Sequence, residues 1–288
     1  MNITGTTGLT ALLGSPVSHS ISPLMHNEAF RLLGLDYVYL CFDVTEKALP
    51  EAVAGLTACG IRGFNLTMPD KNAIVPLLHE LSDAASMIGA VNTVVVENGR
   101  LIGHNTDGVG FMQAARDAGH DLANKTITLM GAGGAATAIC AQAALDGVAA
   151  IHLFLRSTSR FHGRMEALAE RINRELPCRV FLHEHGDETA LKDALAESFL
   201  LINATSVGMA PHTEESVITD LSLFRGSELV VSDVIYNPRE TLLLRTAREA
   251  GLRTFNGMYM LLYQGAEAFR LWTGHEMPIP EIKARFFT

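Results

Sequence analysis

The sequence has few cysteines and no long apolar segment. Its four cysteines are far apart and form no CxxC pair, which is typical of reduced thiols in a cytoplasmic protein. The longest apolar runs are only as long as a strand, and residues 1–10 have neither the basic nor the apolar region of a signal peptide. We therefore expect a cytoplasmic protein with no transmembrane span.

Positive charge is also scarce. Lysine and arginine number 22 against 31 aspartates and glutamates, which gives a net charge of −9. So acidic a chain argues against a nucleic-acid partner and against a basic helix on a membrane surface.

Metal-binding motifs are missing as well. The eleven histidines form no HExxH motif. His183 and His185, with Glu184 between them, lie in a polar segment that we interpret as a solvated turn rather than a metal site. We expect no bound metal.

The chain is long and rich in apolar residues. Its 288 residues exceed the usual size of one domain, which predicts two. Because 48% of the residues are hydrophobic and only 18% are charged, the chain can bury a substantial core.

Residues 126–138, TITLMGAGGAATA, combine an apolar run, a glycine turn and an alanine-rich helix. Gly131, Gly133 and Ala136 fit the G-x-G-x-x-G/A pattern of dinucleotide-binding turns. In such a turn the phosphates bind to the free N–H groups at the helix N-terminus. The alternative is an ordinary tight turn between a strand and a helix.

Strand and helix patterns alternate through the whole chain. We expect strands at 9–13, 38–44, 63–66, 91–96, 101–103, 126–130, 151–155, 200–203, 229–234 and 254–255. We expect helices at 24–33, 46–58, 73–78, 106–118, 160–176, 241–250 and 258–271. The Asn98-Gly99 pair indicates a hairpin. The alternation predicts an α/β fold with mainly parallel sheets, whose second half is a Rossmann-like domain.

The loop after the second strand of that domain indicates the cofactor. An acid there would bind the ribose of NAD, whereas arginine accommodates the 2′-phosphate of NADP. The loop contains Arg156, Ser157 and Arg160 and has no acid before Glu166. NADP is therefore favoured. The alternative for Arg160 is a residue that merely begins a surface helix.

Three turns of the first half are unusually polar. In SHSISP, the hydroxyls of Ser20 and Ser22 face one side of an extended segment and could bind a carboxylate or hydroxyls. Capping of the helix that begins near Pro23 is the alternative for Ser22.

The segment NLTMPDK places Thr67 and Lys71 at a strand end, where open α/β sheets bind ligands. A lysine there could move a proton, although an exposed lysine at a helix start is the commoner case. Asp107 is a natural N-cap and Asn92 a natural turn residue.

Taken together, these motifs resemble one family. In order along the chain, SHSISP, NLTMPDK, GAVNT, NTDG, GAGGAATA, NATSVGM, DVIYNP and GMYMLLYQGA are similar to the motifs of the shikimate dehydrogenases, which include the quinate/shikimate dehydrogenases. The resemblance implies reversible hydride transfer between shikimate and 3-dehydroshikimate, in the pathway to chorismate and the aromatic amino acids. It also implies a substrate domain at 1–108 plus 258–288 and a dinucleotide-binding domain at 109–257.

The resemblance assigns roles to individual residues. The catalytic pair falls on Lys71, which would give or take the hydroxyl proton, and on Asp107, which would favour the ammonium form. The substrate-binding residues fall on Ser20, Ser22, Thr67, Asn92, Tyr236 and Gln264. The cofactor-binding residues fall on Gly131, Ala132, Gly133, Gly134, Ala135, Arg156, Ser157, Arg160, Thr205, Val234 and Gly257. The expected partners are NADP, with NAD possible, and shikimate, 3-dehydroshikimate or quinate. We expect a monomer or a homodimer.

The chain departs from the family pattern at two positions. NADP-using members commonly have Asn-Arg-Thr-x-x-Arg after the second strand, and here Leu155 replaces the asparagine. Asp70 precedes Lys71 where many biosynthetic members have an apolar residue, and an inward carboxylate could raise the pKa of the lysine.

Three alternative functions remain open at this stage. One is a quinate/shikimate dehydrogenase that uses NAD, and another is a weakly catalytic paralogue that senses nucleotide and a cyclitol acid. The third is a related enzyme for an amino-substituted shikimate or a folate. The hydroxyl-rich and amide-rich turns argue against a flat pterin ring.

Overall fold

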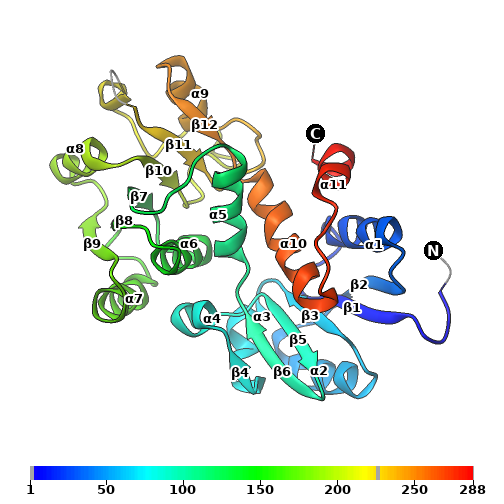
Figure 1. Cartoon of the computed structure of the whole chain (residues 1–288). Coiled ribbons are helices and arrows are strands. Elements are labelled where there is room, and N and C mark those ends of the chain that lie inside the picture. Colours follow the sequence, from blue (N-terminus) through cyan, green and yellow to red (C-terminus); the bar gives the residue numbers. More distant parts are fainter. Residues whose placement is uncertain (1–2, 225–227, 288) are drawn as a thin grey trace. The chain divides into compact units, whose positions relative to one another are not determined.

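The computed structural model describes residues 3–224 and 228–287. The chain divides into two compact units, which we call unit 1 (Met1–Thr106 with Leu262–Thr288) and unit 2 (Asp107–Leu261). Each contains one six-stranded sheet with helices on both faces. The α/β class and the Rossmann-like architecture predicted from the sequence are confirmed (Figure 1). In the part of the chain described, no helix is both long and apolar enough to cross a membrane.

Unit 1 has a mixed sheet in the order β2-β1-β3-β5-β6-β4. Its elements are β1 (Gly8–Gly14), α1 (Ser22–Leu33), β2 (Tyr37–Asp43), η1 (Glu46–Ala48), α2 (Leu49–Ala58), β3 (Gly63–Leu66), α3 (Asp70–Ala73), η2 (Val75–Leu77), β4 (Glu80–Leu81), α4 (Asp83–Ile88), β5 (Thr93–Glu97), β6 (Arg100–His104) and α11 (Ile279–Phe286), with most of α10 (Met258–Thr273). The expected hairpin joins β5 to β6, and Asn98 and Gly99 both have the positive φ that its turn needs.

Alternation along β1 gives the sheet of unit 1 two apolar faces. Ala11 and Leu13 belong to a core cluster that also contains Leu49 and Val53 of α2. On the opposite face, buried aromatic side chains of α1 and α10 surround Tyr39 of β2. Figure 1 shows α1 and α2 on opposite sides of these strands.

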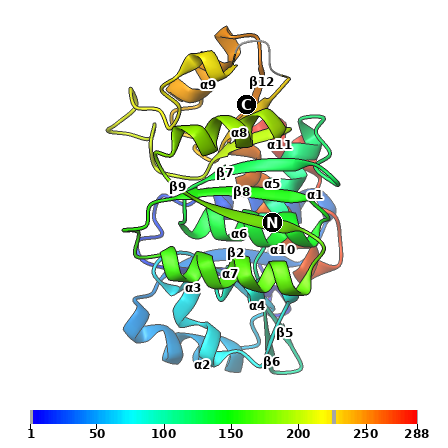
Figure 2. The same ribbon diagram turned by 90° about the vertical axis from the view of Figure 1, so that its left-hand side faces the viewer.

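Unit 2 has an entirely parallel sheet in the order β12-β11-β10-β7-β8-β9. Its elements are α5 (Asp107–Asp117), β7 (Thr126–Met130), α6 (Gly134–Leu145), β8 (Ala150–Leu155), α7 (His162–Glu175), β9 (Arg179–Glu184), α8 (Glu188–Glu197), β10 (Leu200–Asn203), η3 (Leu221–Phe224), β11 (Val230–Asp233), α9 (Leu242–Glu249) and β12 (Arg253–Phe255). In Figure 2, α8 lies on one side of β7 and β8, while α6 and α7 lie on the other. The chain reverses its direction of winding between β7 and β10, and ligands of open parallel sheets bind at such a point.

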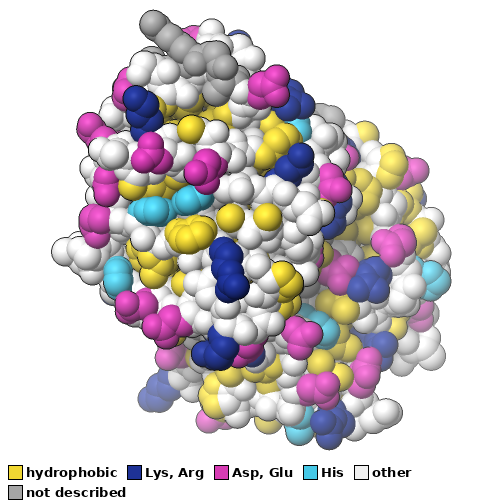
Figure 3. Space-filling model, turned by 60° about the vertical axis from the view of Figure 1, so that its left-hand side comes forward, with side chains coloured by type: hydrophobic (Ala, Val, Ile, Leu, Met, Phe, Trp, Pro, Cys, Tyr) yellow, Lys and Arg dark blue, Asp and Glu magenta, His cyan; other side chains and the backbone are white. Residues whose placement is uncertain are grey.

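Two sequence expectations about the elements were wrong. The helix expected at 73–78 is instead a short α3 followed by the 3-10 turn η2, because Pro76 has no N–H to continue an α-helix. The segment around His183 is the edge strand β9 rather than a solvated turn. His183 stacks on Phe154 and its Nε2 lies 3.0 Å from Nδ1 of His152. Figure 3 shows histidine side chains next to hydrophobic ones on the face of the molecule that it draws.

Candidate functional site

The glycine turn follows β7 at the winding reversal of unit 2. Gly131 has a φ of +116°, which side chains rarely adopt, and a Cβ there would lie 2.8 Å from the carbonyl oxygen of Ala204. The neighbouring Ala132 is buried. Only glycine therefore fits at the first position of the turn.

The N-terminus of α6 is open. Gly133 is its N-cap residue and no side chain of the described residues caps the helix. A Cβ added at Gly133 or Gly134 would meet nothing within 4 Å, whereas Ala136 is completely buried. Uncovered N–H groups at the positive end of a twelve-residue helix suit a pyrophosphate, so the turn fits a dinucleotide.

The loop after β8 carries two exposed arginines, Arg156 and Arg160. The guanidinium of Arg160 lies 4.6 Å from the centre of the Phe161 ring. The N–H of Ser159 donates to the carbonyl of Arg156 at 2.9 Å, so the loop is a folded turn. Leu155 ends β8 with its side chain in the core, so this departure from the family pattern replaces an amide by a packing residue.

The structure also brings an acid to this loop. Glu184, the last residue of β9, accepts hydrogen bonds from the Ser157 N–H at 2.9 Å and 3.2 Å. The sequence did not indicate a cofactor role for Glu184, because the acid that binds the ribose was expected within the loop after β8 itself. The pairing of Leu155 with Glu184 across β8 and β9 could have indicated it, had β9 been recognised as a strand.

The loops after β10 and β11 are joined by buried hydrogen bonds. Asp233 accepts from the Asn203 side chain at 3.0 Å and from the Thr241 hydroxyl at 2.9 Å. Burial raises the pKa of the Asp233 carboxyl, and these hydrogen bonds act in the opposite direction. Asn203 in turn accepts from the Thr205 hydroxyl at 2.7 Å. The position of Thr205 is therefore coupled to that of the β11 loop.

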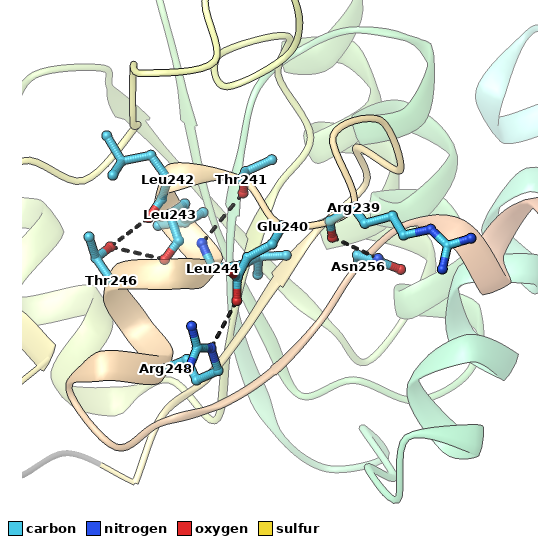
Figure 4. Close-up of polar contacts among 9 residues, drawn as sticks. All are labelled: Arg239, Glu240, Thr241, Leu242, Leu243, Leu244, Thr246, Arg248 and Asn256. Atoms are coloured by element: carbon cyan, nitrogen blue, oxygen red, sulfur yellow. Dashed lines mark hydrogen bonds and ion pairs between the residues drawn. The ribbon is translucent and has the colours of Figure 1, made fainter. Parts of the chain in front are cut away.

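The β11 loop leads into α9. Thr241 caps this helix by accepting from the Leu244 N–H, and the ion pair between Glu240 and Arg248 lies beside it (Figure 4). The Asn256 amide donates to the Arg239 carbonyl at 2.8 Å. These contacts fix the end of the β11 loop that adjoins α9.

Three more of the expected site residues belong to this part of unit 2. Val234 and Tyr236 lie in the β11 loop, and the Tyr236 side chain is 50% exposed. A Cβ on Gly257 would overlap the carbonyl of Val234. The Gly257 backbone can approach β11 so closely only because it has no side chain.

In unit 1 the structure brings one expected residue, Asn92, into a set of buried hydrogen bonds. We call this set the buried polar network, and its members are Tyr39, Asn65, Asn92, Thr93 and Thr106. The Tyr39 hydroxyl donates to Asn65 at 2.8 Å. The Asn65 amide donates to Thr93 at 2.9 Å. Sequence reasoning missed Tyr39, whose position in a strand gave no sign of its polar role.

Asn92 is the other end of the buried polar network. Its Oδ1 accepts from the Thr106 N–H at 2.8 Å and from the Thr93 hydroxyl at 3.1 Å, while its amide donates to the Thr106 hydroxyl at 3.0 Å. Thr106 directly precedes Asp107, which is half-buried and is the first residue of α5. Asn92 therefore fixes the backbone immediately before Asp107.

Ser20 and Ser22 lie at the start of α1. The Ser20 hydroxyl oxygen accepts from the Ser22 N–H at 3.2 Å, and the N-cap position of the helix is taken by the apolar Ile21. Ser22 is thus the first helical residue rather than its cap. A hydroxyl oxygen that accepts still has its own proton to donate, which Ser20 can offer to an anion.

Thr67 and Lys71 follow β3 and are both half-buried. The Lys71 carbonyl accepts from the Val91 N–H at 2.8 Å, which fixes the backbone of the lysine. Asp70 is completely buried, and its carboxylate has no hydrogen-bond partner among the residues described. Burial is the main cause of its raised pKa, with the charge of Glu46 second. Burial therefore disfavours the charged form of the Asp70 carboxyl, which directly precedes Lys71 in the sequence.

The last expected residue, Gln264, is half-buried on α10, beside the buried Tyr263. Gly265 follows it, and a Cβ there would overlap Met25 of α1. Close packing of α10 on α1 therefore sets the position of Gln264 in unit 1.

Comparison with known proteins identifies relatives of the whole chain. Residues 12–94 match the shikimate dehydrogenase substrate binding domain, and residues 257–285 match the shikimate 5′-dehydrogenase C-terminal domain. The shikimate dehydrogenase (NADP(+)) of Listeria monocytogenes serotype 4b is 49% identical over 285 residues, which cover 99% of this chain and 97% of the relative. That of Streptococcus pyogenes serotype M28 is 50% identical over 284 residues, which cover 98% and 97%.

A solved structure agrees with these relatives. The crystal structure of shikimate 5-dehydrogenase from Listeria monocytogenes in complex with shikimate and NAD has a TM-score of 0.95 and 49% identity, and the match covers 99% of this chain and 98% of that one. Identity at this level over nearly the whole length shows common descent as well as a common fold. The chain belongs to the shikimate dehydrogenase family.

Proposed function

We propose that the chain is a shikimate dehydrogenase that prefers NADP and catalyses reversible hydride transfer between shikimate and 3-dehydroshikimate. The observation that carries this proposal is the end-to-end likeness to shikimate dehydrogenases (NADP(+)). The open glycine turn and the two exposed arginines one strand away are what such a cofactor needs. The reaction belongs to the pathway to chorismate and the aromatic amino acids.

The cofactor supplies or accepts the hydride, and residues of unit 2 would hold it. We assign the pyrophosphate to the backbone from Gly131 to Ala135, and the 2′-phosphate to Arg156, Ser157 and Arg160. Thr205, Val234 and Gly257 complete the set. Their backbone positions are fixed by the packing of β10, β11 and the loops that follow them.

The proton transfer is assigned to Lys71. In oxidation of shikimate its amine would take the proton of the reacting hydroxyl, and in reduction its ammonium would return one. We assign Asp107 to favour the ammonium, as an opposite charge does. Both residues are held by their backbone, Lys71 through Val91 and Asp107 through the bond of Thr106 to Asn92.

Substrate binding is assigned to hydroxyls and amides. Ser20 and Ser22 would bind the carboxylate of shikimate, and Asn92 and Gln264 its ring hydroxyls. Thr67 and Tyr236 complete the substrate set. Much of the rate should come from holding the reacting atoms in line, which the buried polar network of unit 1 favours because its members are already fixed.

We expect a cytoplasmic enzyme, in keeping with four cysteines that are far apart in the sequence. We also expect a monomer or a homodimer, with small molecules as its only ligands.

The test is a matrix of substrates against cofactors. Initial rates are measured for shikimate and quinate, each with NADP and with NAD. The proposal predicts the highest kcat/KM for shikimate with NADP. A highest value for quinate with NAD would make the chain a quinate dehydrogenase, and the absence of turnover with tight binding of nucleotide would make it a sensor.

A further inference from the structure

Glu184 lies where β8 and β9 end side by side. It pairs with Leu155 in the register of the two strands, and the His185 N–H donates to the Leu155 carbonyl at 2.8 Å. Because the strands are parallel, their carboxyl ends meet at the same edge of the sheet. From there both carboxylate oxygens of Glu184 accept the Ser157 N–H, at 2.9 Å and 3.2 Å.

This contact places a negative charge in a loop that otherwise favours anions. Arg156 and Arg160 each carry one positive charge, and in the described part of the chain neither forms an ion pair. Glu184 removes half of that net charge and also occupies the Ser157 N–H. A 2′-phosphate would be repelled by the carboxylate and would lose this N–H donor. The 2′-hydroxyl of NAD can instead donate to a carboxylate.

We propose, on the basis of the function proposed above, that Glu184 is a specificity-determining residue that reduces the preference of this enzyme for NADP over NAD. It acts as the acid that dinucleotide-binding domains usually carry at the end of the second strand. Here the acid comes from the neighbouring strand. The two arginines and Glu184 act in opposite directions, and the measured preference is the balance between them.

A merely structural role of Glu184 would be to hold the loop in shape. The loop has other contacts that do so, because the Phe161 N–H donates to the Ser159 hydroxyl at 3.2 Å and the His162 N–H donates to the Ser159 carbonyl at 2.9 Å. Glu184→Gln keeps an oxygen that can accept from Ser157 and removes only the charge. Glu184→Asp keeps the charge. The two variants therefore separate charge from shape.

Dissociation constants for NADP and NAD, measured by calorimetry, test the proposal. Glu184→Gln should tighten NADP binding roughly tenfold, as expected for removing one charge near a phosphate at the surface, and should leave NAD unchanged or weaker. Glu184→Asp should keep the ratio of the wild type. The matched control is Glu170→Gln, which removes the same charge from an exposed position on α7 and should change neither constant.

A second pair of probes isolates the 2′-phosphate. Adenosine 2′,5′-bisphosphate and adenosine 5′-monophosphate differ only in that group, and Glu184→Gln should favour the first roughly tenfold. An unchanged ratio in both experiments would overturn the proposal, as would an equal effect of Glu170→Gln. Neither experiment requires turnover. If the wild type fails to oxidise shikimate, the proposed function is wrong while the role of Glu184 is still decided by binding.

Discussion

In unit 1 Asn92, which is assigned to the substrate, is buried and bonded within the buried polar network, whereas in unit 2 the groups assigned to the cofactor are mainly bare backbone and exposed arginines. Asn92 is 2% exposed and has hydrogen bonds to two threonines. A Cβ added at Gly133 or Gly134 would have no atom within 4 Å. Arg156 and Arg160 lie on the surface.

This difference follows from what each unit is assigned to bind. A small ring with several hydroxyls is recognised by donors and acceptors held in a fixed arrangement, and burial supplies that rigidity. Phosphates are recognised by charge and by N–H groups, which need only an open approach. Substitutions in the buried polar network of unit 1 should therefore affect both folding and activity, whereas those in the cofactor loop of unit 2 should change affinity alone.

The largest expected effect is that of Lys71→Ala. Removing the group that moves the proton should lower kcat by about 100- to 10,000-fold while the substrate still binds. The main-chain hydrogen bond from Val91 does not need the side chain, so we expect the fold to persist. Stopped-flow or steady-state rates measure the loss, and Lys47→Ala, at an exposed position on η1, is the control. An unchanged rate would remove Lys71 from the mechanism.

The next effect concerns His26, which is completely buried among aromatic rings and has no hydrogen-bond partner among the described residues. Burial lowers its pKa to about 3 from an ordinary value of 6.5. The unfolded chain therefore binds the proton more readily, and stability is complete above pH 6.5 and falls as the pH decreases towards 3. A difference of this size corresponds to roughly 5 kcal/mol.

Denaturant unfolding of the wild type and of His26→Phe, measured from pH 7 to pH 4, tests this. The variant should lose less stability on acidification than the wild type, because phenylalanine does not titrate. The exposed His19, replaced by phenylalanine, is the control. Parallel plots of unfolding free energy against pH for all three proteins would mean that protonation of His26 does not destabilise the folded state.

Asn92→Leu should have a smaller effect on stability. It leaves the buried Thr106 N–H without its acceptor, which we expect to cost about 2 to 3 kcal/mol of unfolding free energy, together with most of the activity. Asn72→Leu is the control, because Asn72 is exposed and its side-chain amide donates to the Gly89 carbonyl. Equal losses in the two variants would break the contrast between buried and exposed polar residues.

Of the four substitutions, Arg156→Gln should have the smallest effect on activity and stability. We expect about a tenfold weaker affinity for NADP, little change for NAD and an unchanged midpoint of thermal unfolding, because the side chain is exposed. Calorimetry and a thermal melt measure the two quantities. A lower melting point with unchanged NADP affinity would reverse the roles given to the two units.

Local patterns predicted much of this molecule. The glycine turn at Gly131 and the hairpin at Asn98 depend on backbone conformations that few other residues adopt, so the sequence alone indicates them. The buried strands β8, β10 and β11 were recognisable because apolar residues, several of them β-branched, predominate in them or directly precede them. The edge strand β9 was not, because half-exposed strands carry polar residues such as His183 and Glu184.

Features that depend on distant residues could not be predicted. The polar role of Tyr39 could not be recognised locally, because its hydroxyl donates to Asn65, 26 positions away in the sequence. Glu184 lies 27 positions in the sequence from Ser157, whose N–H donates a hydrogen bond to it. Resemblance to the family named the site residues but could not describe the buried polar network or the acid in the cofactor loop, because both arise from the way strands are paired in three dimensions.

Transfer of an isotope tests the central claim most directly. Shikimate that carries deuterium on the carbon of the reacting hydroxyl is incubated with the enzyme and NADP, and the nicotinamide product is analysed by mass spectrometry. The proposed function predicts NADPH that contains one deuterium together with 3-dehydroshikimate, and a rate that falls by about two orders of magnitude or more in Lys71→Ala. Deuterium that appears in water, or no transfer at all, would contradict direct hydride transfer between shikimate and the cofactor.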